Sequence, residues 1–431
     1  MKILVVGGGG REHAIVWKLS KSKKVTEIFC APGNGGISEI ANCVPLSAED
    51  IEGLLRFSKK EKIDLAVIGP ENPLASGIVD AFLENGIPAF GPRKKAALIE
   101  TSKVFAKRIM KKYGIPTADF EVFEDYGKAI AHATGREIPF VVKADGLCGG
   151  KGAYVIRRKE EAYSVLEDLF VKKVHGIAGE RVIVEDCLTG QEISYLAFCD
   201  GKTFLPLIPS QDHKALLDND MGPMTGGMGA YAPVPFLSNE LEENIKANIM
   251  GKTLEALREE GVEYKGILYG GLMLVGEKPY VLEFNARFGD PETQAILVKM
   301  DSDLLPIISS CVNGTLHEIG EIKWKEGYAV CVVVASRGYP WKPEKDKPIE
   351  GLDFLRDLDD VIVFHAGTKK VGDRYYTSGG RVLNIVAIGK ELQDTIEKVY
   401  DAISTINFEG MFFRKDIGKK ALDYIRRIDN G

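Results

Sequence analysis

Residues 281–293, VLEFNARFGDPET, combine an apolar strand pattern with polar side chains that can bind phosphate or a metal ion. Successive side chains of a strand point to opposite faces, so Glu283, Asn285 and Arg287 are predicted to share one face. The same alternation predicts an opposite, apolar face that carries Leu282, Phe284 and Ala286. A carboxylate and an amide two residues apart offer the oxygen ligands that Mg²⁺ takes together with phosphate oxygens. Arg287, on the same face, could stabilise the negative charge that develops during a reaction by donating two hydrogen bonds. The alternative is an edge strand whose polar face meets solvent.

Residues 141–156, VVKADGLCGGKGAYVI, are predicted to form a phosphate-binding loop between two strands. The first strand presents Lys143, and the loop contains Lys151 among the glycines Gly146, Gly149, Gly150 and Gly152. Glycines allow backbone N–H groups to approach phosphate oxygens and form an anion-binding concavity. The spacing differs from G-x-x-x-x-G-K-[ST], so this is not a P-loop. The alternative is a plain hairpin loop with surface lysines.

Residues 182–192, VIVEDCLTGQE, form a third candidate segment. Its backbone from Glu185 to Leu188 could hydrogen-bond an adenine edge, and Glu192 could accept from ribose hydroxyls. Upstream, Lys103 lies on a predicted helix and could reach the same nucleotide. Taken alone, residues 182–192 fit an ordinary buried strand better than a nucleotide site, and Lys103 fits a solvated helix face.

The composition, with 45% apolar and 27% charged residues, is that of an ordinary soluble globular protein. The chain has 431 residues, which suggests about three domains. Its formal charge of −6 argues against a nucleic-acid-binding surface. The seven cysteines show no C-x-x-C spacing, which indicates reduced thiols and a cytoplasmic protein. No apolar run of about 18 residues exists, so no membrane span is expected.

Strand and helix patterns alternate over residues 1–101, which predicts an α/β domain with a parallel sheet. Residues 102–325 are predicted to form an α+β domain, with hairpins turning at 200–201 and 276–277 and a lid subdomain at about 120–190. A single long helix is expected over residues 94–113, ending at Gly114 with Pro116 beyond. Residues 326–431 are predicted to form a small strand-rich domain.

Together these segments resemble the ATP-grasp superfamily and, within it, the phosphoribosylamine–glycine ligases, also called glycinamide ribonucleotide synthetases. The resemblance is carried by KADGLCGGKG, VEDCLTGQE, SQDHK, GPMTGGMGAY and VLEFNARFGDPET, and extends to GGGGREHA, GPENPL, FHAGT, SGGRVL and FRKDIG. It implies that glycine is phosphorylated by ATP to glycyl phosphate. The amine of 5-phosphoribosylamine then displaces phosphate, in the second step of de novo purine synthesis. Such a ligase is expected to be a monomer or a weak homo-oligomer.

The resemblance also implies roles for individual residues. Glu283 and Asn285 correspond to ligands of Mg²⁺ or Mn²⁺. The implied ATP contacts are Lys103, Lys143, Asp145, Gly146, Gly149, Gly150, Lys151, Gly152, Glu185, Leu188 and Glu192. The groups expected to act on glycine and the acyl phosphate are Arg287, Asp212, His213 and Lys214. The implied substrate contacts are Gly8, Gly9, Gly10, Glu71, Thr225, Gly226, Gly227, Asp290, Thr368, Ser378 and Arg381.

Three other functions compete with this interpretation. The glycines of GGGGREHA suggest a nicotinamide dehydrogenase, but Glu12 or His13 stands where the fingerprint needs a third small residue. A non-catalytic nucleotide-binding protein would not need a complete metal site. The third alternative is a ligase or carboxylase of the same superfamily with another acceptor. Only the whole-length resemblance to the phosphoribosylamine–glycine ligases separates this alternative from the interpretation above. The chain departs from the family pattern at Cys148 and Gly149, usually alanines, and at Met224 and Ala215, where asparagine and arginine are common.

Overall fold

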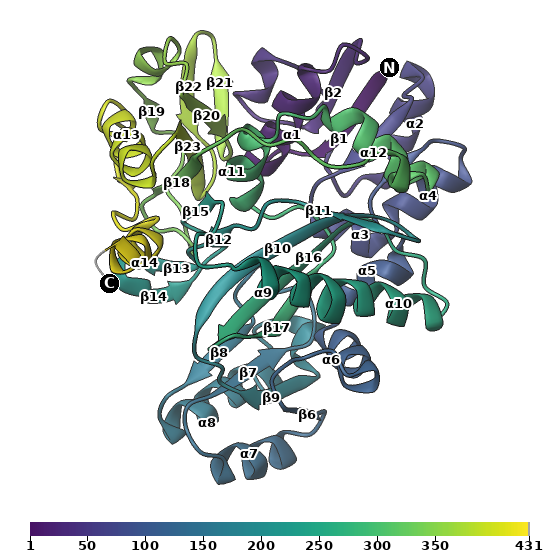
Figure 1. The fold of residues 1–431 in the computed structure, drawn as a ribbon, viewed down its shortest axis with the longest axis vertical. Coiled ribbons are helices and arrows are strands. Elements are labelled where there is room, and N and C mark those ends of the chain that lie inside the picture. Colours follow the sequence, from purple (N-terminus) through teal and green to yellow (C-terminus); the bar gives the residue numbers. More distant parts are fainter. Residues whose placement is uncertain (430–431) are drawn as a thin grey trace.

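The computed structural model describes residues 1–429, arranged as an upper body and a protruding lid (Figure 1). The N-terminal part is a parallel sheet of order β3-β2-β1-β4-β5, as predicted. Its strands are β1 (Lys2–Gly7), β2 (Glu27–Pro32), β3 (Asn42–Cys43), β4 (Leu65–Ile68) and β5 (Ala89–Phe90). Its helices are α1 (Gly10–Ser20), α2 (Ile51–Glu61), α3 (Glu71–Ser76) and α4 (Ile78–Glu84). The strand order reverses at β1, where ligands of such sheets bind.

The predicted helix over residues 94–113 is in fact two helices, α5 (Lys94–Thr101) and α6 (Lys103–Tyr113). Ser102 between them is extended, and its side chain caps α6 by accepting from the N–H of Phe105. The prediction of one helix was wrong. The helical sequence pattern continues through Ser102, but a tertiary contact of this serine interrupts the helix. Ser102 donates to Oδ1 of Asp145 at 3.0 Å. The end at Gly114, in the left-handed region, is confirmed.

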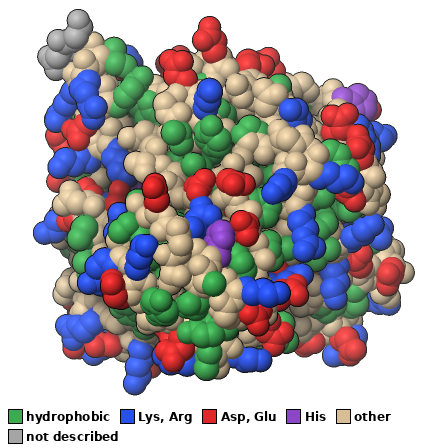
Figure 2. Space-filling model, turned by 90° about the horizontal axis from the view of Figure 1, so that it is seen from below, with side chains coloured by type: hydrophobic (Ala, Val, Ile, Leu, Met, Phe, Trp, Pro, Cys, Tyr) green, Lys and Arg blue, Asp and Glu red, His purple; other side chains and the backbone are tan. Residues whose placement is uncertain are grey.

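The lid projects at the bottom of Figure 1 and has its own core. Its sheet has the order β6-β9-β7-β8. The strands are β6 (Phe120–Phe123), β7 (Phe140–Ala144), β8 (Ala153–Ile156) and β9 (Val182–Asp186), and the helices are α7 (Tyr126–Gly135) and α8 (Lys159–Phe170). Figure 2 views the molecule from this end and shows acidic and basic side chains interspersed over the face.

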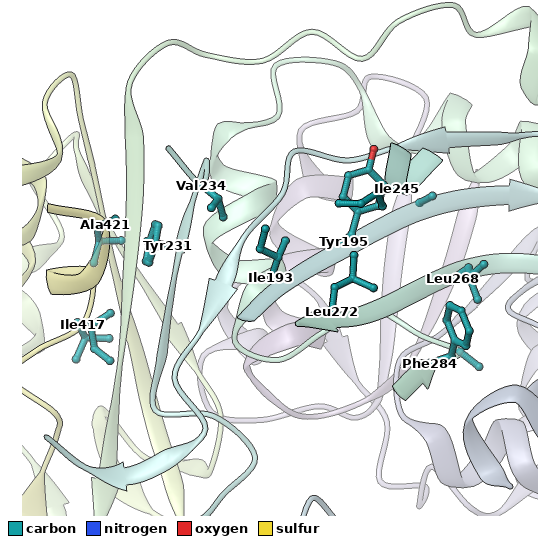
Figure 3. Close-up of a cluster of buried hydrophobic side chains, with 14 of the residues drawn as sticks. Ile193, Tyr195, Tyr231, Val234, Ile245, Leu268, Leu272, Phe284, Ile417 and Ala421 are labelled. Atoms are coloured by element: carbon teal, nitrogen blue, oxygen red, sulfur yellow. The ribbon is translucent and has the colours of Figure 1, made fainter. Parts of the chain in front are cut away.

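The central sheet, order β11-β10-β16-β17, contains both predicted hairpins. Its strands are β10 (Gln191–Asp200), β11 (Phe204–Pro206), β16 (Lys265–Val275) and β17 (Lys278–Asn285), flanked by α9 (Asn239–Ile245), α10 (Lys252–Glu259), α11 (Glu292–Lys299) and α12 (Leu304–Asn313). Figure 3 shows apolar side chains of β10, β16 and β17, including Tyr195, Leu272 and Phe284, in the main core. The cluster continues towards the C-terminus at Ile417 and Ala421.

A bulge in β17 corrects the predicted alternation of residues 281–287. Gly271 of β16 pairs with Glu283, whereas Leu272 pairs with Val281, so Leu282 is the extra residue. Val281 therefore joins Phe284 in the main core, and Leu282 leaves the apolar face assigned to it. Beyond the bulge, Glu283 and Asn285 keep the spacing that was expected.

The C-terminal sheet has the order β12-β15-β18-β23-β20, with β24 also paired to β18. Its strands are β12 (Gln211–Asp212), β15 (Gly229–Ala232), β18 (Tyr328–Ser336), β20 (Val361–His365), β23 (Arg381–Gly389) and β24 (Met411–Phe412). Smaller sheets contain β13 (Ala215–Leu217) and β14 (Met221–Met224), and β19 (Pro348–Ile349), β21 (Thr368–Val371) and β22 (Arg374–Thr377). The last helices are α13 (Leu392–Ser404) and α14 (Lys419–Asp429). Because β12 and β15 come from the middle of the chain, this sheet crosses the proposed division at residue 325.

Short helical turns complete the fold at η1 (Ile37–Glu39), η2 (Gly176–Gly179), η3 (Asp218–Asp220), η5 (Leu316–Glu318) and η6 (Leu352–Leu355), with a π-helical segment η4 (Lys246–Gly251). Over residues 1–429 no helix is both long enough and apolar enough to cross a membrane. The cysteines in this part of the chain carry free thiols.

Candidate active site

A cleft of about 740 Å³ lies between the lid and the central sheet and extends to the C-terminal part. Its walls include most of the residues predicted from sequence. From the ATP set these are Lys103, Lys143, Gly146, Gly149, Gly150, Gly152, Glu185, Leu188 and Glu192. From the other sets they are Glu71, Asp212, Lys214, Thr225, Gly226, Glu283, Asn285, Arg287, Asp290 and Arg381. Segments about 310 residues apart in sequence thus form one cavity, from Glu71 in the N-terminal part to Arg381 in the C-terminal part.

The carboxylate of Glu185 lies between two lysines inside the cleft. Lys143 Nζ is 2.6 Å from Oε1, and Lys107 Nζ is 2.5 Å from Oε2. Burial tends to raise the pKa of Glu185, but the two ammonium groups hold it below its usual value. Lys143 also donates to the carbonyl of Leu282 at 2.9 Å, which joins the lid to β17. The positive charge predicted for this wall is therefore present and is fixed in place by a buried carboxylate.

The glycine-rich loop at residues 146–152 packs against other segments. Lys103 Nζ donates to the carbonyl of Gly146 at 2.7 Å. Gly150 has φ +78°, and a Cβ there would lie 3.1 Å from the carbonyl oxygen of Thr225, so the position requires glycine. Asp145 lies behind the loop, where its carboxylate pairs with Arg181 at 2.6 Å. Asp145 therefore anchors the loop.

Glu283 and Asn285 both line the cleft, at the end of β17. Burial tends to raise the pKa of Glu283, but lysines, Lys214 and Lys143 foremost, lower it, so the carboxylate is charged. Within residues 1–429 no three His, Cys, Asp or Glu side chains cluster closely enough to hold a metal ion by themselves. A carboxylate and an amide oxygen beside cationic side chains fit a hard divalent ion whose remaining ligands are phosphate oxygens and water.

Asp212 and Lys214 face the cleft from the segment that follows β10 and β11. Lys214 Nζ lies 3.6 Å from Glu192 Oε2 and 3.9 Å from Glu283 Oε1. Burial, opposed by Lys214 and reinforced by neighbouring carboxylates, raises the pKa of Asp212 to about 8. Lys214 therefore balances several carboxylates that could not all ionise together without it.

His213 lies outside the cleft, contrary to its predicted place among the reacting groups. Side chains alternate along the segment, so His213 points away from the face that carries Asp212 and Lys214. Its ring is buried, with Nδ1 3.4 Å from the carbonyl of Gly229. Burial foremost, together with the positive charge of Arg414, lowers the pKa of His213 to about 4. The ring is thus a neutral, buried group.

Arg287 joins the end of β17 to the N-terminal part. Its Nε lies 3.3 Å from Glu71 Oε2, and one terminal nitrogen lies 3.1 Å from Glu100 Oε1. The other donates to the carbonyl of Phe288 at 3.2 Å. Burial tends to raise the pKa of Glu71, but Arg287 and Arg11 lower it to about 2. The two carboxylates thus fix the orientation of the Arg287 guanidinium at the cleft wall.

A second group of predicted residues lies where the N-terminal and C-terminal parts meet. A Cβ at Gly10 would lie 2.2 Å from Asn384 Nδ2, so the glycine run directly contacts β23. The Asn34 side chain donates to the carbonyls of Gly8 and His365, at 3.0 and 2.8 Å. Thr368 Oγ1 lies 3.0 Å from His365 Nδ1. The structure therefore brings the glycine run and the loop before β21 together.

Other predicted substrate contacts lie close to this junction. Arg381 pairs with Oδ2 of Asp290 at 3.1 Å and donates to the carbonyl of Gly226 at 2.8 Å. The N–H of Ser378 donates to the carbonyl of Gly367 at 2.7 Å. Gly9 donates to Glu12 Oε2 at 2.6 Å, and Gly227 donates to Thr225 Oγ1 at 3.0 Å. Of these, Arg381, Asp290, Gly226 and Thr225 reach the cleft.

Sequence reasoning missed several cleft residues, namely Arg11, Glu100, Lys107, Tyr269 and Glu292. Lys107 could have been found, since it lies four residues after Lys103 on one helix face. Glu292 is one of the polar residues of segment 281–293, but the sequence does not identify Tyr269 as its hydrogen-bond partner. Tyr269 donates to Glu292 Oε1 at 2.5 Å from the neighbouring strand β16.

Sequence models of the phosphoribosylglycinamide synthetase family match successive parts of the chain: the N domain over residues 1–100, the ATP-grasp (A) domain over 101–293 and the C domain over 329–420. The phosphoribosylamine–glycine ligase of Caldanaerobacter subterraneus subsp. tengcongensis is 48% identical over 417 residues, which cover 97% of this chain and 99% of that protein. The trifunctional purine biosynthetic protein adenosine-3 of Gallus gallus is 44% identical over 98% of this chain and 42% of that longer protein.

Solved structures agree with these relatives. The crystal structure of phosphoribosylamine–glycine ligase from Thermotoga maritima has a TM-score of 0.83 and 34% identity, and the comparison covers 97% of this chain and 100% of that chain. A biotin carboxylase complex from Campylobacter jejuni, at 14% identity and a TM-score of 0.73, covers 96% and 93% and shares the fold alone. The resemblance found in the sequence is thereby confirmed, and the chain belongs to the phosphoribosylglycinamide synthetase family of ATP-grasp ligases.

Proposed function

We propose that the chain joins the carboxylate of glycine to the amine of 5-phosphoribosylamine, converting ATP to ADP and phosphate and forming glycinamide ribonucleotide. This is a carbon–nitrogen ligation and the second step of de novo purine synthesis. The observation that carries the proposal is the single cleft in which Lys143 of the lid, Glu283 and Asn285 of β17, and Arg381 of β23 meet. The family relationship extends over all three matched parts of the chain, which supports the same activity.

ATP would lie between the lid and the central sheet. The backbone from Glu185 to Leu188 would meet the adenine edge, and Glu192 the ribose. Lys103, Lys143 and the backbone of the glycines at 146, 149, 150 and 152 would surround the phosphates, because the two lysines supply positive charge and the glycines supply backbone N–H donors to the same wall. The carboxylate of Glu185 keeps Lys143 extended towards β17.

Glu283 and Asn285 would hold Mg²⁺ or Mn²⁺, which when bound neutralises charge on the triphosphate. The residues fit such an ion because both are oxygen donors at the cleft wall. The chain supplies two ligands and leaves the others to phosphate and water, as Mg²⁺ prefers.

Glycine would lie beside Asp212, Lys214 and Arg287. Its carboxylate attacks the γ-phosphate of ATP, and the bond between that phosphorus and the bridging oxygen of ADP breaks. Arg287 can bind the carboxylate and then the acyl phosphate, because Glu71 and Glu100 fix its orientation. An oxygen of Asp212 can accept a hydrogen bond from the ammonium group of glycine. The loop at residues 225–227 covers the acyl phosphate, and rate enhancement comes mainly from positioning and charge neutralisation.

5-Phosphoribosylamine would occupy the junction of the N-terminal and C-terminal parts. Gly8, Gly9 and Gly10 offer close backbone contact at the end of β1. The remaining proposed contacts are Glu71, Asp290, Thr368, Ser378 and Arg381. The amine attacks the acyl carbon, phosphate leaves, and an amide forms. The division at residues 101 and 325, a cytoplasmic location and a monomer or weak homo-oligomer belong to the same proposal.

The test is to mix the protein with ATP, Mg²⁺, glycine and freshly generated phosphoribosylamine, and to measure ADP and amide product together. We expect ADP release to depend on glycine and the amide to appear with it. A nicotinamide-dependent absorbance change without ATP would favour a dehydrogenase. Absence of ADP release with any carboxylate would indicate a nucleotide-binding protein, and ADP release with a different acceptor would indicate another ligase.

A further inference from the structure

Three segments distant in sequence meet beside the cleft: the lid loop at 146–152, the loop at 225–227 and residues 337–344, which follow β18. Lys151 Nζ donates to the carbonyl of Pro340 at 2.8 Å. The N–H of Gly226 donates to the hydroxyl oxygen of Tyr339 at 3.1 Å. Two consecutive residues of the C-terminal part thus hold the two loops that border the reacting atoms.

The junction is tightly packed. A Cβ at Gly380 would lie 2.3 Å from the ring of Tyr339, so the tyrosine is seated directly on the backbone before β23. Arg381 donates to the carbonyls of Gly226 and Asp290, at 2.8 and 2.7 Å. Gly226 is therefore held at its N–H by Tyr339 and at its carbonyl by Arg381. Its position is fixed by the C-terminal part.

The contact of Lys151 departs from the role predicted for it. Gly150 and Gly152 line the cleft, whereas the Lys151 ammonium lies at Pro340. This ammonium joins the lid to the C-terminal part across 189 residues of sequence. A lysine that binds only phosphate would have no need of this carbonyl.

We propose that Tyr339 and Lys151 are positioning residues that latch the lid loop and the 225–227 loop together over the acyl phosphate and exclude water. The proposal rests on the proposed function, because an acyl phosphate must be protected. If water enters, its oxygen bonds to the acyl carbon, the bond to the phosphate oxygen breaks, and a proton passes to solvent. Glycine is regenerated, and the net reaction is ATP hydrolysis to ADP and phosphate. Exclusion of water by closure prevents this side reaction.

The experiment compares Tyr339→Phe and Lys151→Met with the unchanged protein. Moles of amide formed per mole of ADP are measured, together with the KM for ATP. Lys159→Met and Tyr163→Phe are matched controls on α8. Lys159 also donates to a backbone carbonyl, that of Thr134 at 2.9 Å, but within the lid. The Tyr163 side chain is exposed.

We expect the unchanged protein and both controls to form about one amide per ADP, and each latch variant to form less than about half an amide per ADP. The KM for ATP should stay within about twofold in both latch variants. A one-to-one ratio in both latch variants would overturn the proposal. So would an increase of about tenfold in the KM for ATP of Lys151→Met with full coupling, because Lys151 would then be a phosphate ligand.

The two proposals fail differently. If the unchanged protein releases no glycine-dependent ADP, the proposed function is wrong. If it couples fully and the variants do so as well, only the latch is wrong. Thermal unfolding verifies the fold of each variant. If Lys151→Met is unstable, the amide-to-ADP ratio of Tyr339→Phe, which removes only one hydroxyl, tests the latch by itself.

Discussion

Lys143 Nζ lies 2.6 Å from Oε1 of Glu185, and the two residues stand on adjacent antiparallel strands of the lid sheet, β7 and β9. Lys107 approaches the same carboxylate from α6. One buried carboxylate therefore forms ion pairs with two buried ammonium groups. The carboxylate fixes the two lysines in the wall that is proposed to meet the phosphates. Sequence reasoning had not paired Glu185 with any lysine.

Replacing Glu185 by Gln should destabilise the protein by about 3–5 kcal/mol, because it leaves two buried ammonium groups without their counter-charge. Urea unfolding of the variant measures this. Glu167→Gln is the control, since Glu167 pairs with Lys172 at 3.1 Å on the exposed face of α8 and should cost less than about 1 kcal/mol. Equal stabilities of the two variants would show that the Glu185 pairings contribute nothing beyond a surface ion pair.

Replacing Glu283 by Gln should lower glycine-dependent ADP release by at least about 100-fold while the fold stays intact, because the proposed metal ion loses its charged ligand. Raising the Mg²⁺ concentration should recover part of the activity. Glu277→Gln, at the exposed turn of the same hairpin, is the control. Near-native turnover of Glu283→Gln would refute the metal assignment.

Replacing Arg381 by Ala should raise the KM for phosphoribosylamine by about tenfold or more, because a charged hydrogen bond to phosphate contributes about 1.5–3 kcal/mol. The KM for ATP should change by less than about twofold. Arg374→Ala, an exposed arginine of β22, is the control. Equal increases for both substrates would contradict the proposed phosphate site.

The thermal stability of the protein should fall as the pH is lowered from about 6.5 to about 4, in part through His213. Burial lowers the pKa of His213 to about 4 in the folded protein, whereas the unfolded chain titrates near 6.5. Between these values the unfolded state binds more protons, so stability rises with pH by up to about 1.4 kcal/mol per unit. Arg414, Lys420, Asp220 and Asp416 are the charged groups around the ring.

The check is the thermal midpoint of His213→Gln measured across this pH range. Its dependence on pH should be shallower than that of the unchanged protein. The control His317→Gln alters a side chain that is 64% exposed and should leave the dependence unchanged. Parallel curves for His213→Gln and the unchanged protein would show that the pKa of His213 is the same in the folded and unfolded states, and would contradict this prediction.

The sequence predicted the architecture and most of the cleft because strand patterns, glycine-rich loops and paired polar residues are local signals. It failed where distant contacts decide. The helix break at Ser102 depends on Asp145, and the bulge at Leu282 depends on pairing with β16. Lys151 has the positive charge expected of a phosphate ligand, yet its hydrogen-bond partner is the carbonyl of Pro340, 189 residues away in sequence. The prediction grouped His213 with Asp212 and Lys214 as reacting residues, although the alternation of side chains along the segment turns His213 away from the cleft.

The most direct test of the account follows oxygen from glycine into phosphate. With glycine labelled by ¹⁸O in its carboxylate, a glycyl phosphate intermediate requires that one labelled oxygen leave with the phosphate for each amide formed. Mass spectrometry of the released phosphate should therefore find about one ¹⁸O per amide. Phosphate free of the label, with amide formed in equal amount, would show that ATP does not activate the glycine carboxylate and would contradict the account.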